Sequence, residues 1–273
     1  MRPTRLKPLL RPLLLPLFLA GLIALAGCAT RPPASDPEAL AEFRETNDPM
    51  EPLNRAMYQV NEALDVLAIR PAAEAYRIFL PPEARTGIRN VISNLRSPII
   101  ALNDALQGEG QRFGTTIGRF LLNSTLGVGG IFEVATSFGL PPHSEDFGQT
   151  LAVRGAVEGP YMFLPVLGPS NPRDLFGAGI DLALNPLTWL TGNEVVNAAL
   201  YARTGLGILD TRESLLEPLD ALKQGSLDPY ASLRAAYRQR RAAEIANEGG
   251  ATQRDVGTGF GVGPGPLLEN SPD

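Results

Sequence analysis

Residues 113–142 read FGTTIGRFLLNSTLGVGGIFEVATSFGLPP, and they say more about the architecture than any other part of the chain. Arg119 and Glu133 are the only charged residues among these thirty, and six of the thirty are glycines. The spacing Gly114-x-x-x-Gly118 permits two helices to approach closely. The pattern is typical either of a buried helical hairpin in a soluble core or of a pair of helices that enter a lipid layer without crossing it.

The N-terminus predicts secretion and a lipid anchor. Four basic residues precede an apolar stretch from Leu13 to Ala26, which is the layout of a secretory signal. The stretch ends in Leu25-Ala26-Gly27-Cys28, which resembles the lipobox of bacterial lipoproteins, where a diacylglycerol is attached to the cysteine. The alternative is a free thiol after an ordinary signal peptide, but the position of Cys28 favours lipidation. Because Ala29 follows instead of aspartate, the lipoprotein rule predicts passage to the outer membrane.

Composition narrows the class of protein. The full chain has 273 residues, of which 44% are hydrophobic, so a sizeable core can be buried. The formal net charge is −5 and the body contains no Lys/Arg-rich run, so no nucleic-acid footprint is visible and no nucleic-acid partner is predicted. No run after the signal reaches the roughly 18 to 20 apolar residues of a spanning helix. We predict a signal peptide over 1–27, an acylated tether over 28–46, a helical domain over 47–246 and a disordered tail over 247–273.

Helical periodicity dominates the predicted domain. Apolar residues recur at spacings of three and four between Leu53 and Leu67, which predicts an amphipathic helix that Pro71 ends. Further helices are expected over 72–80 and 83–96, with another that begins at Pro98. Downstream we expect helices over 173–185, 186–204, 205–224 and 227–246, with a break at Gly192 in the second of these. No clean strand alternation appears, so the predicted fold class is all-α.

The segment 159–174, GPYMFLPVLGPSNPRD, interrupts this helical pattern. Its apolar run from Tyr161 to Gly168 lies between two Gly-Pro pairs and contains Pro165. Proline breaks helices and is confined to edges and bulges in strands. We therefore expect an irregular, stiff loop within a loop-rich centre over 143–174.

A catalytic site is not predicted. The single histidine, His143, neighbours Ser144, Glu145 and Asp146, but residues adjacent in sequence rarely form a triad and no G-x-S-x-G elbow is present. One histidine and one cysteine make a poor metal site, and no cofactor motif is found. Adjacent acids more often cap a helix or pair with an arginine. For Arg119 and Arg173, internal salt bridges are the expected role.

Several stretches together resemble one family. They are NDPMEPLNR (47–55), NEALD (61–65), AYR (75–77), NLRSP (94–98), LNDALQG (102–108), GRFLLNSTLGVGGIFEVA (118–135), EDFGQTL (145–151), GPYMFLPVLGPSNPRD (159–174) and DPYASLRAAYRQRR (228–241). The chain is similar over about residues 47–241 to the MlaA lipoprotein family, also called VacJ, of Gram-negative outer membranes. The combination of EDFGQTL with GPY-x-x-LP-x-LGPS is highly specific.

The resemblance implies a ring-like bundle of amphipathic helices that lies in the inner leaflet of the outer membrane. In the family, phospholipid that has strayed into the outer leaflet passes through a central amphipathic channel to the soluble periplasmic carrier MlaC. Trimeric porins associate with the ring, and the result is preserved lipid asymmetry. Phospholipid, a trimeric outer-membrane porin and MlaC are thus the implied partners.

Cys28 is the candidate for lipid attachment. Two further groups of residues are candidates for the functional site. The candidates for channel or lipid contact are Phe147, Gly159, Pro160, Tyr161, Phe163, Leu164 and Pro165. The candidates for membrane embedding are Phe113, Ile117, Phe120, Leu121, Leu122, Ile131 and Phe132. Two other functions remain open: a structural lipoprotein that clamps porins, and a lipid hydrolase that uses Ser144 and His143.

Overall fold

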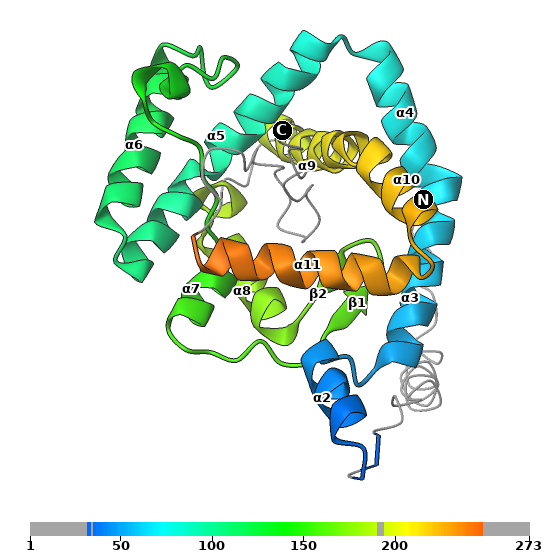
Figure 1. Ribbon diagram of the computed structural model, residues 1–273. Helices are drawn as coiled ribbons and strands as arrows, with labels where there is room; N and C mark the ends of the chain where they lie inside the picture. Colours follow the sequence, from blue (N-terminus) through cyan, green and yellow to red (C-terminus); the bar gives the residue numbers. More distant parts are fainter. Residues whose placement is uncertain (1–31, 34, 190–193, 248–273) are drawn as a thin grey trace, which may run out of the picture.

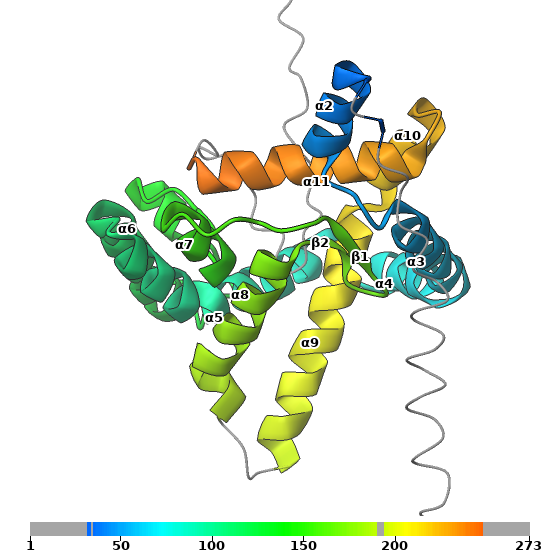
Figure 2. The same cartoon turned by 90° about the horizontal axis from the view of Figure 1, so that it is seen from below.

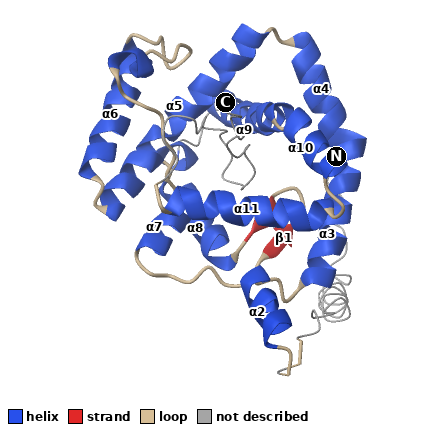
Figure 3. Cartoon of the chain, viewed as in Figure 1, coloured by secondary structure: helices blue, strands red, loops and turns tan. Residues whose placement is uncertain are grey.

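The computed structural model describes residues 32–33, 35–189 and 194–247, and Figure 3 shows that they are predominantly helical. The signal segment, Cys28, Gly192 and almost all of the expected tail lie outside the described residues. The α-helices are α2 (Pro37–Thr46), α3 (Glu51–Leu64), α4 (Arg70–Phe79), α5 (Pro82–Gln107), α6 (Gly110–Thr125), α7 (Phe147–Val153), α8 (Pro172–Leu184), α9 (Glu194–Ser214), α10 (Leu216–Gly225) and α11 (Pro229–Ile245). A π-helix, η1 (Asp65–Ile69), and two 3₁₀ turns, η2 (Ala135–Phe138) and η3 (Pro186–Trp189), complete the helical elements.

The helices form a ring. In Figure 1, α3 and α4 run up one side, α5 returns down the other, and α11 closes the circuit. The α6 helix packs on the outside of α5, and α9 lies inside the circuit, seen almost end-on. Figure 2 shows that α8 and α9 extend from one side of the ring, whereas α2 lies on the opposite side. No described helix is long and apolar enough to cross a membrane.

Two prolines do not end helices where the sequence predicts. The helix that begins with α3 continues through η1 into α4, and Pro71 lies in the first turn of α4. The backbone N–H of Arg70 still donates to Asp65, so the missing donor of Pro71 falls where the π pattern gives way to the α pattern. Pro98 lies inside the single helix α5, which buried residues such as Ile99 and Ile100 hold in place. Packing therefore overrides the local cost of these prolines.

The stretch 113–142 forms one helix and not two. After α6 the chain turns sharply, with positive φ at Val128, Gly129 and Gly130. The backbone N–H of Gly130 donates to the carbonyl of Asn123 at 2.8 Å, which folds the turn back on the helix end. A Cβ atom at Gly130 would lie 2.8 Å from Cβ of Asn94, so α5 also requires glycine there. The predicted second helix is wrong because these glycines favour a turn.

The segment 159–174 contains a small β-hairpin, which the sequence did not predict. Strand β1 (Met162–Leu164) pairs antiparallel with β2 (Gly168–Ser170), and Phe163 lies opposite Pro169. A two-stranded sheet has only edges, so Pro169 and Pro165 remove no hydrogen bond from a central strand. Helix α7 also lies within the expected loop-rich centre. The all-α class is unaffected by so short a hairpin.

The other helix boundaries lie closer to those predicted from the sequence. The helices expected over 72–80, 173–185 and 227–246 correspond to α4, α8 and α11. The expected break near residue 204 is wrong, because α9 continues to Ser214 and the break comes at Leu215. Residues Pro37–Thr46, inside the expected tether, form α2, whose first turn is capped by Asp36 accepting from the N–H of Ala39 at 3.0 Å.

Candidate functional site

An aromatic core holds the hairpin of residues 159–174. Tyr161 and Phe163 are 2% and 3% exposed. They belong to a cluster made of Tyr161, Phe163, Tyr230, Leu233 and Tyr237, with Met57, Tyr58 and Leu219 packed against it. Tyr58 meets Phe163 edge to face with ring centroids 5.6 Å apart, the geometry that ring quadrupoles favour. Core packing thus explains the apolar character of these two residues, and their contact with lipid stays a prediction.

Polar side chains of the NDPMEPLNR motif fix this hairpin in place. The Asn54 amide donates to the carbonyl of Tyr161 at 3.1 Å and accepts from the N–H of Phe163 at 2.9 Å, so it pairs with β1 as a neighbouring strand would. Asp48 accepts from Asn54 at 2.7 Å and from the hydroxyl of Tyr230. The motifs NDPMEPLNR, GPYMFLP and DPY therefore converge on one structural unit.

Arg241 of α11 joins two further motifs. Its guanidinium donates to both carboxylate oxygens of Asp146 at 2.7 and 2.8 Å and to Asp174 at 2.8 Å. Burial alone would raise the pKa of Asp146, but the charge and hydrogen bonds of Arg241 hold that pKa below its ordinary value. Asp146 also caps α7 by accepting from the N–H of Gln149. The expectation that these acids cap a helix or pair with arginine is confirmed.

His143 belongs to a buried polar network. Its Nε2 atom lies 3.0 Å from the hydroxyl oxygen of Thr116 and 3.1 Å from both carboxylate oxygens of Asp104. The neighbouring Glu145 accepts from Arg112 and from Gln107. All of the contacts just described link α5, α6 and the loop before α7, so the network ties these elements together.

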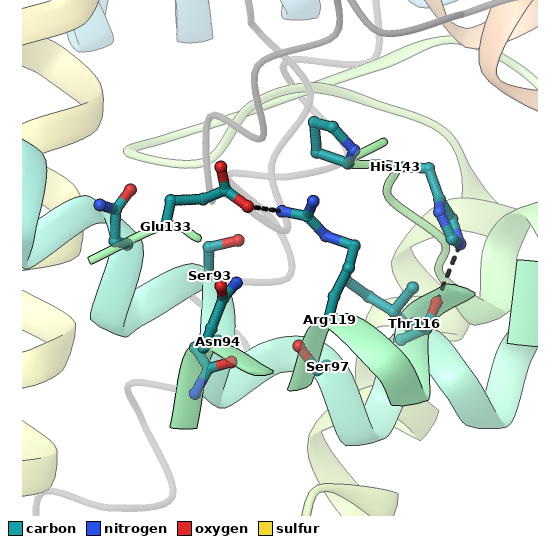
Figure 4. Close-up of a pocket in the computed structure, with 11 residues that line it drawn as sticks. Ser93, Asn94, Ser97, Thr116, Arg119, Glu133 and His143 are labelled. Carbon is teal, nitrogen blue, oxygen red and sulfur yellow. Dashed lines mark hydrogen bonds and ion pairs between the residues drawn. The ribbon is translucent and has the colours of Figure 1, made fainter. Parts of the chain in front are cut away.

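A polar pocket opens beside this network (Figure 4). Arg119 of α6 and Glu133 form an ion pair of 3.1 Å across it, as expected for Arg119. The pocket holds about 30 Å³, close to the volume of one water molecule and far below the hundreds of Å³ of a typical ligand pocket. It therefore has no room for a lipid headgroup.

Ion pairs also line the contact between α9 and the ring. Arg212 donates to both carboxylate oxygens of Asp65, in the π-helix, at 2.6 and 2.7 Å. Asp210 accepts twice from Arg89 of α5, at 2.9 and 3.0 Å. Glu213 is buried and pairs with arginines of α4 and α5. The contact between α9 and the ring thus buries several paired acids and arginines.

Arg203 of α9 differs from these arginines in the charges around it. It is half-buried, and its Nε atom, like Nε of Arg85 and Nη1 of Arg212, is buried without a hydrogen-bond partner. Within the described ranges no acid pairs with its guanidinium, and the charge that acts on it is that of another cation, Arg96 of α5. Burial and the charge of Arg96 both lower the pKa of Arg203. An arginine offers planar, bidentate donation to phosphate or carboxylate oxygens, so this position suits an anionic group supplied from outside the described chain.

The predicted site residues fall into distinct places. Of the channel candidates, Tyr161 and Phe163 are in the core, Pro165 is exposed, and the others are half-buried; these are Phe147, Gly159, Pro160 and Leu164. Five of the membrane candidates are exposed, namely Phe113, Ile117, Leu121, Ile131 and Phe132, whereas Phe120 and Leu122 are half-buried. Lipid contact by either group stays a prediction.

Sequence reasoning missed two features of the site. Arg203 has no motif around it, and only its charge between Glu194 and Asp210 in an otherwise apolar helix marks it. For the apolar surface of α8, η3 and α9, the sequence pattern predicts helices but not their exposure. The sequence does carry a signal for this apolar surface, because Glu194 is the only charged residue from Leu182 to Ala202.

The architecture by itself defines a class of protein: a helical ring with paired charges inside and large apolar side chains outside.

The MlaA lipoprotein family model matches residues 46–244. The "Intermembrane phospholipid transport system lipoprotein MlaA" of Escherichia coli K12 is 36% identical over 235 residues, covering 84% of this chain and 87% of the relative. Its counterpart in Haemophilus influenzae is 29% identical over 234 residues, which cover 85% of this chain and 89% of the relative.

A solved structure indicates the same family. It is described as "Structural basis for maintenance of bacterial outer membrane lipid asymmetry", and it superimposes with a TM-score of 0.64 at 35% identity. The match covers 72% of this chain and 98% of that structure. The chain belongs to the MlaA lipoprotein family.

Proposed function

We propose that this protein is an outer-membrane lipoprotein of phospholipid transport that maintains lipid asymmetry. In this proposal, Cys28 carries the acyl anchor and the ring lies in the inner leaflet of the outer membrane, facing the periplasm. Mislocalised phospholipid leaves the outer leaflet through an amphipathic channel and passes to the periplasmic carrier MlaC, while a trimeric porin holds the ring in place. The names of the relatives support transport, and the channel, carrier and porin are parts of the proposal.

One observation carries the proposal at the level of residues. The arginines of the ion pairs described above each contact an acid, whereas Arg203 is influenced by the charge of a second arginine, Arg96, and pairs with no acid in the described part of the chain. A phospholipid supplies the missing anion through its phosphate, and its acyl chains suit the exposed apolar side chains. Arg203 is therefore the proposed contact for the headgroup.

The test measures outer-leaflet phospholipid in cells that lack the gene and are complemented with variants. The native protein and Arg203→Lys are expected to lower this phospholipid, because both keep a cation. Arg203→Glu is expected to fail although it reaches the membrane in normal amount, since it would repel phosphate. Arg44→Glu, on the exposed face of α2, reverses a charge elsewhere and should act as the native protein does.

The other functions make different predictions in the same assay. His143→Ala should support transport, whereas a hydrolase based on His143 and Ser144 would lose its activity. If deletion of the gene leaves outer-leaflet phospholipid unchanged, lipid transport is wrong and a porin clamp is favoured.

A further inference from the structure

Helix α10 is joined to α3 and α4 by ion pairs in antiparallel order. Charged residues recur every three residues along α10, so they lie on one side of the helix. The pairs are Arg77 with Glu217 at 3.0 Å, Arg70 with Asp220 at 2.9 Å, and Lys223 with Glu62 at 2.6 Å. The second and third of these pairs are called the latch below, because they hold the later half of α10.

The latch is open to water. The side chains of Arg70 and Asp220 are 36% and 31% exposed, and those of Lys223 and Glu62 are 25% and 33% exposed. Exposed ion pairs contribute little to stability, and salt screens them. The pairs that hold α9 to the ring are different, because the acids of α9 in them are buried. The ring is therefore bound firmly to α9 and loosely to the later half of α10.

Apolar packing fixes the two ends of this segment but not its middle. Leu216, the first residue of α10, is buried, and Leu219 packs against the aromatic core. The next buried residue along the chain is Tyr230 of α11. Between them, a Cβ atom at Gly225 would meet open space, and Leu227 is fully exposed. Residues 220–227, called the strap, thus have the exposed contacts that mark a segment of low local stability.

Release of the strap leaves no buried charge without a partner. Arg70 also donates to Glu74, one turn further along α4, at 2.9 Å, so it keeps an acid when Asp220 moves away. Glu62 is already partly hydrated, and the released side chains enter water. The penalty for separating a buried ion pair is therefore absent here.

We propose that the strap detaches from α3 and α4 by opening the latch, and that phospholipid transport requires this opening. The requirement rests on the proposed function, whereas the opening itself does not. Figure 2 shows α10 beside α11, on the side of the ring opposite to the extension of α8 and α9, so the opening alters that side of the ring.

The first experiment measures the opening with the latch residues unchanged. Cys28, the only native cysteine, is acylated in the proposed function, so introduced thiols can be spin-labelled selectively. Labels at Ala63→Cys on α3 and Gln224→Cys on α10 occupy exposed positions next to the latch. For the full-length acylated protein in phospholipid vesicles, pulsed electron resonance should give a short and a long distance.

Salt and charge should shift the balance between these distances. The population at the long distance is expected to rise several-fold from low to high salt, because salt screens exposed pairs. Lys223→Glu, which repels Glu62, should raise it as well, whereas Lys223→Arg should leave it unchanged. A single narrow distance that is the same at both salt concentrations and in Lys223→Glu overturns the proposal.

The second experiment prevents the opening in cells. Glu62→Cys with Lys223→Cys is joined by a short thiol-reactive cross-linker that a reductant cleaves. Cross-linked cells should accumulate outer-leaflet phospholipid as cells without the gene do, and the reductant should restore transport. Glu38→Cys with Glu42→Cys is the matched control, because its cross-link joins two exposed positions of α2 and should not affect transport.

The outcomes separate the two proposals. Transport by the cross-linked protein at the native level overturns the requirement for opening. The spin-label distances decide on the latch even if the double-cysteine variant is inactive before cross-linking. If the native protein does not lower outer-leaflet phospholipid, the proposed function fails and the measured opening of the latch still stands.

Discussion

Arg241 illustrates how single residues hold this ring together. Its guanidinium bridges the cap of α7 and the first turn of α8, since Asp146 and Asp174 both accept from it. The pKa of each acid lies below its ordinary value, because the favourable charge and hydrogen bonds of Arg241 outweigh the burial that would raise it. The two acids therefore stabilise the fold when ionised, above a pH of about 4.

Replacement of Arg241 with methionine should leave the carboxylates of Asp146 and Asp174 without this cationic partner. We expect a loss of about 3 kcal/mol of unfolding free energy at pH 7, the scale of breaking a buried ion pair. The loss should shrink as the pH falls below about 4, because protonated acids no longer need the arginine. Thermal unfolding in detergent, followed by circular dichroism across pH, measures this. A deficit that stays constant with pH would contradict the ionic explanation.

Gly177 is a second residue on which packing depends. A Cβ atom at Gly177 would lie 2.3 Å from the backbone nitrogen of Gly148, so α7 and α8 approach too closely for any side chain. We expect Gly177→Ala to destabilise the protein by about 1 to 3 kcal/mol through overpacking. Gly179, two residues further along the same helix, faces open space. Gly179→Ala should be neutral or slightly stabilising, because alanine is the better helix former.

Unfolding midpoints of the two glycine variants provide the comparison. If both alanine variants unfold at the same temperature, the close crossing of α7 and α8 does not limit stability.

At the scale of elements, the sequence predicts helices well where periodicity is strong. The apolar spacing from Leu53 onward and the charged pattern of α11 both correspond to helices. The errors arise where a tertiary contact changes the local outcome. Pro98 remains inside α5 because its neighbours are buried, and no local signal reports that burial. The hairpin around Phe163 depends on the amide of Asn54, more than a hundred residues earlier in the chain.

The exposed face of α6 carries its own prediction. Leu121 is 56% exposed, and if α6 contacts lipid, Leu121→Arg should cost up to about 3 kcal/mol of membrane association. Gln111→Arg, at the exposed start of the same helix, adds the same charge at a polar position and should cost little. Vesicle flotation of both variants against the native protein measures the difference. Equal binding would show that this face of α6 lies in water.

At the scale of the molecule, buried positions hold acids and arginines such as Asp65 and Arg212 beside the aromatic core. Many large apolar residues lie on the surface of α6 and on the surface of α8, η3 and α9. The charge-poor stretch 113–142 is visible in the sequence, but the sequence leaves a buried hairpin and a lipid-facing pair of helices as alternatives. It could not indicate Arg203, because the absence of an acidic partner becomes visible only when α5 and α9 are placed side by side.

The exposed apolar side chains predict how strongly the protein binds membranes without the proposed acyl anchor. If Cys28 carries the anchor as proposed, Cys28→Ala removes the acyl chains, each of which contributes about 0.8 kcal/mol per buried CH₂ group. If the anchor alone held the protein, the variant would leave the membrane completely. We expect it instead to bind vesicles weakly and reversibly, because the exposed apolar side chains of α6, α8, η3 and α9 would still bury area in lipid. Adding Trp189→Asp should then abolish flotation with vesicles, whereas Arg44→Ala on α2 should not. A Cys28→Ala chain that fails to float at all would show that the exterior does not bind lipid and that the acyl anchor accounts for the whole of membrane association.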